Sequence, residues 1–266
     1  SFHPLLSALS DEERAVARHC CDEQSAEWGM PWAPGARGSA EYSVRTIGPP
    51  LFRAVKAYSR SMGVTVNDIL IAAFFASVRR EIPHQEDRDY PVLTSTDLRR
   101  IHPGVRSPAV ANLSVAFEVW LPAGMPGRPH DLVLAAHRVM DEKKRLRVGI
   151  GSAIRLEEMF SSGFGPVREH LLETKRRSRI EGYPKNPFIS NIGILPHPCV
   201  DFGDPQTMAA CVIPPVEYPP GFGIAASTFD RTLTLSCSYC DGPITGRAVE
   251  RVLTSMKEFL STLTSK

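Results

Sequence analysis

The pattern of apolar and polar positions predicts a chain in which helices and strands are interleaved. Toward the end of the chain, apolar side chains recur at the spacing of one helix face: Val249, Val252, Leu253, Met256, Phe259, Leu260 and Leu263. Residues 109–120 alternate instead, which is typical of a strand that is buried on one face by Leu113, Val115, Phe117 and Val119. We interpret the helical stripe as a core contact, because such stripes are far more often core than partner grooves.

The same patterns, followed along the whole chain, predict a mixed α/β layer arrangement. Helices are expected from Ser10 to about Gln24, at 50–62, 66–81, 131–146, 152–160 and 164–180, and from about Thr245 onward. Strands are expected at 41–47, 90–97, 109–120, 186–193, 207–213, 221–229 and 232–239. Residues 27–40, with Trp28, two prolines and several glycines, are expected to form a loop or linker.

Capping signals support two of these helix starts. Ser10 is followed three residues later by Glu13, and Thr65 is followed three residues later by Asp68. This spacing is that of a capping box, in which the two side chains satisfy each other's free backbone N–H groups. Gly63 is expected to end the helix at 50–62 in the left-handed conformation that glycine tolerates.

Composition and charge describe an ordinary globular chain. The 266 residues carry a formal net charge of +2, which gives no reason to expect a nucleic-acid partner. The basic clusters 143–147 and 175–179 fall late in expected helices, so solvated helix ends are the favoured interpretation. Attraction for the phosphate groups of a ligand is the alternative. No uninterrupted apolar run is long enough to span a membrane.

Six cysteines raise the question of a metal site. Cys237 and Cys240 have zinc-like spacing, and Cys199 and Cys211 would complete four ligands. However, Cys237 to Cys240 lies along an expected strand, where positions three apart face opposite sides. We therefore expect no metal, and reduced, mostly buried thiols in a cytoplasmic protein.

Several short sequence motifs occur along the chain in an order that is typical of one superfamily. The run Gly63-Val64-Thr65-Val66-Asn67-Asp68 opens an alanine-rich helix, and the strand at 90–96 leads into Asp97-Leu98-Arg99. Further along come Val110-Ala111-Asn112, Ser190-Asn191-Ile192-Gly193 and the hairpin at 224–236.

Together these words resemble the C-terminal lobe of the chloramphenicol-acetyltransferase-like superfamily. This superfamily includes wax ester synthase/diacylglycerol acyltransferases, polyketide-associated acyltransferases and peptide-synthetase condensation domains. The resemblance covers residues from about 41 to 264, and one departure is Ala111 in place of the usual glycine. It implies an α/β sandwich with a mixed sheet covered by helices. The expected division is a leader helix and linker at 1–40, followed by the lobe at 41–266.

The motif that carries the general base in this superfamily is missing from the chain. Members hold a His-His-x-x-x-Asp-Gly motif in an N-terminal lobe, and no such motif occurs here. The run His137 to Asp141 spells His-x-x-x-Asp, but it lies within an expected helix with no second histidine and no glycine turn. We expect these two side chains to be neighbours on a solvated face. His197, between two prolines, is the least improbable substitute for the base, and His84 lies in a charged loop.

By resemblance, the lobe contributes polar groups to a substrate tunnel. The matching positions are Asn112, Ser190, Asn191 and Gly193. Ser190 and Asn191 would stabilise an oxyanion or bind pantetheine; the equally weighted alternative is that they cap a strand end. Asp97 and Arg99 are expected to form a structural ion pair. Asp201-Phe202-Gly203 resembles a structural word of plant members, although Asp204-Pro205 replaces its Trp-Gly.

Two functions remain open from the sequence. The first is an acyltransferase that moves an acyl group from a coenzyme A or carrier-protein thioester to a hydroxyl or amine. Its base would come from an N-terminal lobe on another chain or on a removed segment, and no bound cofactor is expected. The second is a non-catalytic lobe that binds an acyl chain, a carrier protein or a partner enzyme. A lone lobe would expose the apolar face that meets its mate, which predicts self-association or a tight companion.

Overall fold

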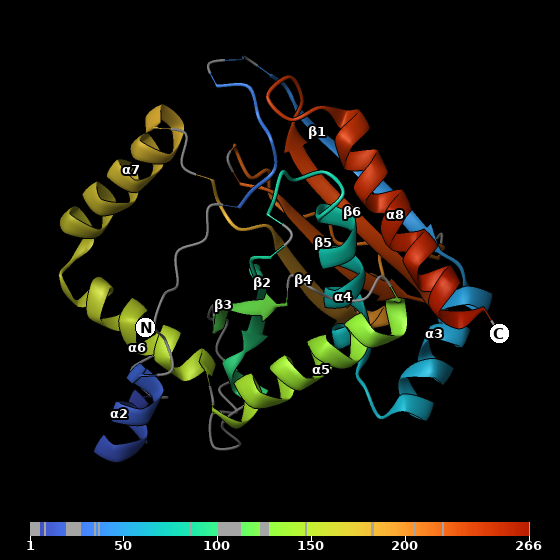
Figure 1. The fold of residues 1–266 in the computed structure, drawn as a ribbon, viewed down its shortest axis with the longest axis horizontal. Coiled ribbons are helices and arrows are strands. Elements are labelled where there is room, and N and C mark those ends of the chain that lie inside the picture. Colours follow the sequence, from blue (N-terminus) through green and yellow to red (C-terminus); the bar gives the residue numbers. More distant parts are fainter. Residues whose placement is uncertain are drawn as a thin grey trace.

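A six-stranded mixed sheet forms the centre of the molecule (Figure 1). The computed structural model describes residues 6–7, 9–19, 28–34, 36, 38–85, 87–100, 113–122, 128–146, 148–181, 184–204, 206–219 and 221–265. The strands are β1 (Ala40–Ile47), β2 (Tyr90–Asp97), β3 (Ser114–Leu121), β4 (Phe188–Ile194), β5 (Gly223–Phe229) and β6 (Thr232–Cys240). Their order is β1-β6-β5-β4-β2-β3, with β4 parallel to both β5 and β2 and the other pairs antiparallel. The predicted α/β class with a mixed sheet is confirmed.

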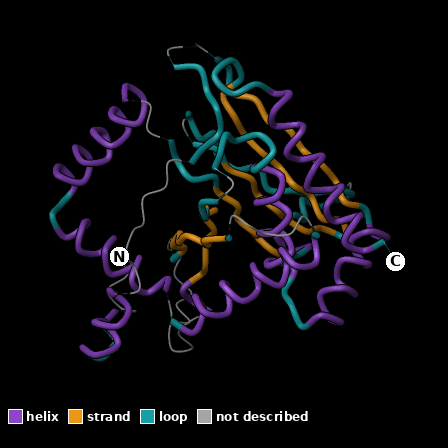
Figure 2. Tube along the Cα trace, in the orientation of Figure 1, coloured by secondary structure: helices purple, strands orange, loops and turns teal. Residues whose placement is uncertain are grey.

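Helices cover one face of this sheet (Figure 2). They are α3 (Pro49–Met62), α4 (Val66–Val78), α5 (Pro129–Arg145) and α8 (Gly246–Thr264). The helix α4 is apolar on all sides, and its core side chains, such as Ile69 and Phe74, are fully buried. An all-round apolar helix is stable only where other elements surround it, and α4 lies between the sheet, α5 and α8.

The predicted caps of α3 and α4 are confirmed. Thr65 Oγ1 accepts from Asp68 N at 3.1 Å, and Asp68 Oδ2 accepts from Thr65 N at 2.9 Å. Gly63 has φ +65°, the left-handed conformation that lets the chain leave α3 and turn into α4. The predicted stripe of α8 is also confirmed, because Val249, Val252, Leu253, Met256 and Leu260 are buried.

A second apolar cluster lies at the β3 edge of the sheet. It joins α2 (Asp11–His19) and α6 (Val148–Ser161) to Val115 of β3. A Cβ on Gly149 would stand 2.7 Å from Thr96 Cγ2, so glycine permits the close approach of α6 to the sheet. The next helix, α7 (Phe164–Glu181), extends away from the body in Figure 1.

The N-terminal segment is tied to the main core by one tryptophan. Trp28 is 1% exposed and stacks on Tyr90, with ring centroids 4.6 Å apart, and on Phe75 at 5.9 Å. Residues 28–34 form no helix or strand, as predicted. The proposed boundary at residue 41 stays a prediction.

Four element predictions need correction. The strand predicted at 207–213 is wrong, because residues 206–214 pair with no strand. Pro214 and Pro215 lack the N–H groups that a ladder needs. Hydroxyl groups hold this segment instead: Ser227 Oγ accepts from Val212 N at 3.0 Å, and Ser236 Oγ donates to Val212 O at 2.6 Å.

The other corrections concern where elements begin and end. Helix α4 ends at Val78 rather than residue 81, and α6 begins at Val148 rather than 152. The β3 strand begins at Ser114, and residues 101–112 lie outside the described part of the chain.

The expectation of mostly buried thiols is half correct for the four cysteines that the structure describes. Cys237 and Cys240 are buried, whereas Cys199 and Cys211 are exposed. Cys199 lies in the short 3-10 helix η2 (His197–Cys199) and Cys211 in the segment without a ladder, which explains their exposure.

Among the described residues, no single helix is long and apolar enough to cross a membrane. Only α3 and α4 taken as a pair reach that length, and they are bent by 110° at their junction.

Candidate functional site

The candidate site begins with two hydroxyl groups on neighbouring strands. Ser95 of β2 and Ser190 of β4 are half-buried, and their Oγ atoms lie 3.0 Å apart in a hydrogen bond. Their strands are parallel and pair at Leu93 with Phe188 and at Thr94 with Ile189. Ser95 and Ser190 are the next residues of that register, so both hydroxyls fall on the same face of the sheet. Ser95 lies near the carboxyl end of β2, and Ser190 is the third residue of β4.

Sequence reasoning identified Ser190 but missed Ser95. The run Thr94-Ser95-Thr96 gives no local sign of which hydroxyl matters. The partner becomes visible only once β2 and β4 are known to be neighbours, although 95 residues separate the two serines in sequence.

The hydroxyl pair has donor capacity to spare. Two hydroxyls carry two O–H hydrogens, and the bond between them uses one. The second hydrogen is free to point at a developing negative charge. A paired hydroxyl is also polarised by its neighbour, which strengthens the bond that it gives.

Asn191 and Gly193 form the turn that follows this pair. Asn191 Oδ1 accepts from Gly193 N at 3.1 Å, and Gly193 has φ +88°. The pairing of β4 with β5 shifts between these two residues, which marks a β-bulge. Nothing lies within 4 Å of a Cβ built on Gly193, so the backbone conformation alone demands glycine. The exposed Asn191 therefore holds the bulge of β4 through its side-chain oxygen.

The remaining tunnel and ion-pair positions divide into two cases. Asn112 lies outside the described residues. Arg99 Nη1 stands 3.2 Å from Asp97 Oδ1, immediately after Ser95 along the chain, and both side chains are about one-third exposed. An ion pair with this much solvent contact contributes little stability, so it fixes the turn after β2 rather than the lobe.

The surroundings of His137 differ from those predicted. His137 Nδ1 lies 2.8 Å from Asp68 Oδ2, and the Asp68 side chain is fully buried. Asp141 pairs instead with Arg145 at 3.0 Å, so the predicted His137–Asp141 neighbours on a solvated face are wrong. The interaction was not visible in the sequence because it joins α5 to the capping box of α4, 69 positions away.

Other histidines in the described part of the chain have partners away from the serine pair. His130 Nδ1 is 2.7 Å from the Tyr58 hydroxyl, and His84 contacts Arg79. Burial, with a smaller contribution from Asp131, raises the pKa of Tyr58, so this phenol stays protonated. His197 lies just beyond β4, and its ring packs against Phe229 with centroids 4.7 Å apart. The hydrogen bond of Ser190 goes to Ser95, not to an imidazole.

The word at Asp201-Phe202-Gly203 is an exposed turn. Asp201 Oδ1 accepts from Gly203 N at 3.0 Å, and Gly203 has φ +89°. Phe202 is 86% exposed, so this word contributes no core contact within the chain.

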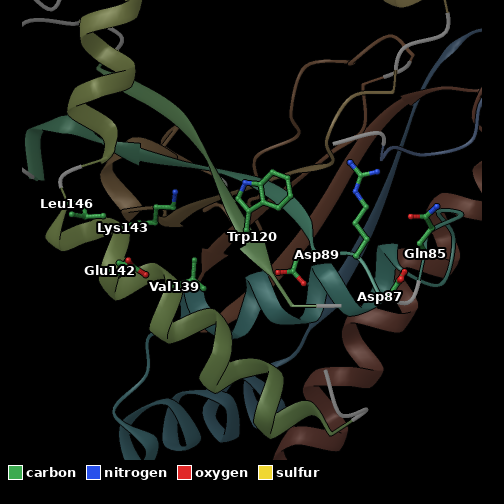
Figure 3. A pocket seen from close by; sticks show the side chains of 9 residues that line it. Gln85, Asp87, Asp89, Trp120, Val139, Glu142, Lys143 and Leu146 are labelled. Carbon is green, nitrogen blue, oxygen red and sulfur yellow. The ribbon is translucent and has the colours of Figure 1, made fainter. Parts of the chain in front are cut away.

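A groove of about 830 Å³ lies where β2 begins and β3 ends, away from the end of β2 that carries Ser95 (Figure 3). Its walls come from the loop before β2, from β3 and from the C-terminal half of α5: Gln85, Asp87, Arg88, Asp89, Trp120, Val139, Glu142, Lys143 and Leu146. Trp120 Nε1 donates to Glu118 at 2.9 Å, which fixes the indole. These walls include no histidine and none of the predicted tunnel residues, so this groove does not complete the serine pair. Within the described residues, no three His, Cys, Asp or Glu side chains converge as metal ligands.

Comparison with known proteins shows the fold. No protein-family model and no curated protein matches the chain. Among solved structures, trichothecene 15-O-acetyltransferase TRI3 from Fusarium sporotrichioides is similar, with a TM-score of 0.64, 15% identity, and coverage of 97% of this chain and 54% of that one. Polyketide synthase associated protein 5 from Mycobacterium tuberculosis has a TM-score of 0.61 and 15% identity, with coverage of 98% and 62%. The epimerization domain from the third module of tyrocidine synthetase B has a TM-score of 0.61 and 11% identity, with coverage of 96% and 56%.

These likenesses establish the chloramphenicol-acetyltransferase-like fold that the sequence predicts. The chain spans 54–62% of the length of these three structures, whereas they cover nearly all of it. Acyltransferases and peptide-synthetase domains share this arrangement of sheet and helices.

Proposed function

We propose that this chain is the C-terminal lobe of an acyltransferase. The complete enzyme moves an acyl group from a coenzyme A or carrier-protein thioester to a hydroxyl or amine. The general base, the second histidine of a His-His-x-x-x-Asp-Gly motif, comes from an N-terminal lobe outside this chain. The observation that carries the proposal is the fold match, which takes in 97% of this chain but 54% of the acetyltransferase TRI3.

The serine pair supplies what such a lobe needs opposite the base. Attack on a thioester produces a tetrahedral intermediate with a negatively charged oxygen, and positioned hydrogen-bond donors stabilise it. Ser190 has a hydroxyl on a rigid strand, and Ser95 holds that hydroxyl in place at 3.0 Å. We assign Ser190 as the oxyanion donor and Ser95 as the residue that positions it.

The segment that follows the serine pair supplies exposed apolar side chains for contact with a second lobe. Ile194, Phe202 and Met208 come after the serine pair along the chain and are 72%, 86% and 88% exposed. Exposed apolar side chains of this size are typical of surfaces that a partner covers.

Substitution of the serines in the complete two-lobed enzyme tests these roles. Ser190→Ala lowers kcat by roughly 10- to 100-fold, since loss of one oxyanion donor costs on the order of 10²–10³ where the donor is fully buried. Ser95→Ala lowers kcat less, by about 3- to 10-fold, because Ser190 keeps its hydroxyl but loses its orientation. The measurement is release of free thiol from acetyl-, octanoyl- and palmitoyl-coenzyme A with a hydroxyl or amine acceptor.

Ser162→Ala is the matched control, because Ser162 bonds only to Met159 O at the exposed end of α6. It leaves both kcat and the thermal midpoint unchanged. Asn191→Ala also lowers turnover without unfolding the lobe. Unchanged kcat in both Ser190→Ala and Asn191→Ala would remove the tunnel assignment and favour a non-catalytic lobe that binds an acyl chain or a carrier protein.

A further inference from the structure

The strand β1 forms one edge of the sheet and is open to solvent along most of its length (Figure 1). It pairs with β6 on one side, and no strand of the described chain pairs with its outer side. The ladder with β6 runs without interruption from Ala40 to Ile47. An eight-residue regular edge presents a row of free backbone N–H and C=O groups, which is a template for another strand.

β1 lacks most of the sequence features that prevent an edge strand from pairing with a strand of another chain. The sequence Ala40-Glu41-Tyr42-Ser43-Val44-Arg45-Thr46-Ile47 contains no proline, glycine or lysine, and its register with β6 shows no bulge. Its two charges are of opposite sign and lie at symmetric positions about Ser43. The large apolar side chains Tyr42 and Val44, which are 61% and 41% exposed, are also symmetric about Ser43.

We propose that β1 pairs antiparallel with β1 of a second copy, centred on Ser43, to form a twofold-symmetric dimer with one continuous sheet. In this register Glu41 stands opposite Arg45 of the second copy, and Arg45 stands opposite its Glu41. Tyr42 stands opposite Val44 of the second copy. Opposite charges and aromatic–β-branched pairs are the cross-strand combinations that stabilise antiparallel sheets. The pairing is self-complementary, as a twofold interface must be.

The geometry of the free edge allows this register. Residues that face each other in it have numbers that sum to 86, so both members of a pair are odd or both are even. Alternate residues of β1 direct their backbone N–H and C=O groups to β6, and the others direct them outward. Two residues that face each other in this register therefore either both point their backbone groups toward the second copy or both point them away from it. The existing bond of Arg45 to Glu250 and Thr254 of α8 holds the guanidinium on the helix side of the sheet, the same side as Glu41.

The oligomeric state of the purified chain tests the proposal first. Sedimentation velocity over a micromolar concentration series yields a species of about twice 29.3 kDa that dissociates on dilution. Glu41→Arg places like charges opposite each other twice per dimer and raises the dissociation constant by roughly tenfold. Glu41 is exposed and its side chain accepts a hydrogen bond from Ser39 at the surface, so its replacement leaves the thermal midpoint of the fold unchanged.

Disulfide trapping tests the register. Directly opposite Cβ atoms lie about 4.5–5.5 Å apart, whereas diagonal neighbours lie about 7–8 Å apart. A mixture of Tyr42→Cys and Val44→Cys chains therefore forms a 42–44 cross-link several-fold faster than either variant forms one with itself, as read from cross-linked peptides by mass spectrometry. The mixture isolates this register because β6 places Ser238 and Ser236, not cysteine, opposite these positions within the chain.

Three results would overturn the proposal. One is a chain that stays monomeric throughout the series. The second is a dimer that Glu41→Arg does not weaken. The third is a mixture that cross-links no faster than its components, which would place the dimer contact on another surface.

Discussion

Cys237 shows how burial alone sets the chemistry of a side chain. Burial, and to a smaller extent the charge of Glu217, raises the pKa of Cys237 to about 12. A thiol with such a pKa is neutral at physiological pH, and the thiolate is the reactive form. Cys237 and Cys240 are both buried in β6, and Cys237 is therefore expected to be unreactive in the folded chain.

We expect alkylation to distinguish the exposed cysteines from the buried Cys237. At pH 8, iodoacetamide modifies the exposed Cys199 and Cys211 within minutes and leaves Cys237 unmodified in the folded chain, as peptide mass mapping would show. Rapid modification of Cys237 without unfolding would contradict its placement in the core.

The same thiol makes stability depend on pH. The pKa of Cys237 is higher in the folded chain than in the unfolded chain, where a thiol has a pKa of about 8.5. Its contribution is complete below about pH 8.5 and is lost as pH rises toward about 12. Relative to Cys237→Ala, the wild type loses about 2 kcal/mol of unfolding free energy between pH 7 and pH 10. Urea unfolding at the two pH values measures this difference, and equal losses in both proteins would contradict the assignment.

At the scale of elements, the Asp68–His137 contact joins the start of α4 to the middle of α5. Asp68 Oδ2 serves both the capping box and the imidazole, and the carboxylate is fully buried. Its Oδ1 atom is buried with no hydrogen-bond partner among the described residues. This one side chain therefore adds a polar link between the cap of α4 and the middle of α5 to their apolar packing.

Replacement of Asp68 should lower the unfolding free energy by more than the loss of an ordinary helix cap does. Asp68→Ala lowers the unfolding free energy by about 2–4 kcal/mol, because the cap contributes about 0.5–2 kcal/mol and His137 loses its acceptor. Asp68→Asn, which keeps an acceptor oxygen, costs less than Asp68→Ala. Chemical denaturation compares the two with Ser10→Ala, which removes only the exposed capping box of α2. An Asp68→Ala cost no larger than that of Ser10→Ala would show that the contact to α5 contributes nothing.

Local patterns predicted most elements because each depends on neighbours in sequence. The alternation of β3, the stripe of α8 and the cap of α4 each involve contacts within a few residues or one buried face. The segment 206–214 failed because its strand-like pattern is overridden by prolines and by hydroxyls of β5 and β6. Local rules do not contain such long-range partners.

The candidate site was predictable only in part for the same reason. Ser190, Asn191 and Gly193 form one word of sequence and were found together. Ser95 and Asp68 acquire their partners from the strand order and from the packing of α5 on α4, which no spacing in the sequence reveals.

At the scale of the molecule, similar solved structures cover nearly all of this chain, whereas the chain spans 54% and 62% of the length of two of them. The serine pair lies on the sheet face opposite the helices, and its hydroxyls bond to each other rather than to a base. A hydroxyl pair can stabilise a charged intermediate but cannot deprotonate an acceptor alcohol at neutral pH. The account therefore depends on a second lobe that delivers an imidazole to this face.

The most direct test compares acyl transfer by this chain alone and by the chain combined with an N-terminal lobe that carries the His-His-x-x-x-Asp-Gly motif. Thiol release from acyl-coenzyme A donors is measured for the chain, for the two-lobed protein, and for the two-lobed protein with the second histidine of its His-His-x-x-x-Asp-Gly motif changed to alanine. We predict turnover only in the intact two-lobed protein. Turnover by the 266-residue chain alone, or undiminished turnover after the histidine is changed to alanine, would contradict the account.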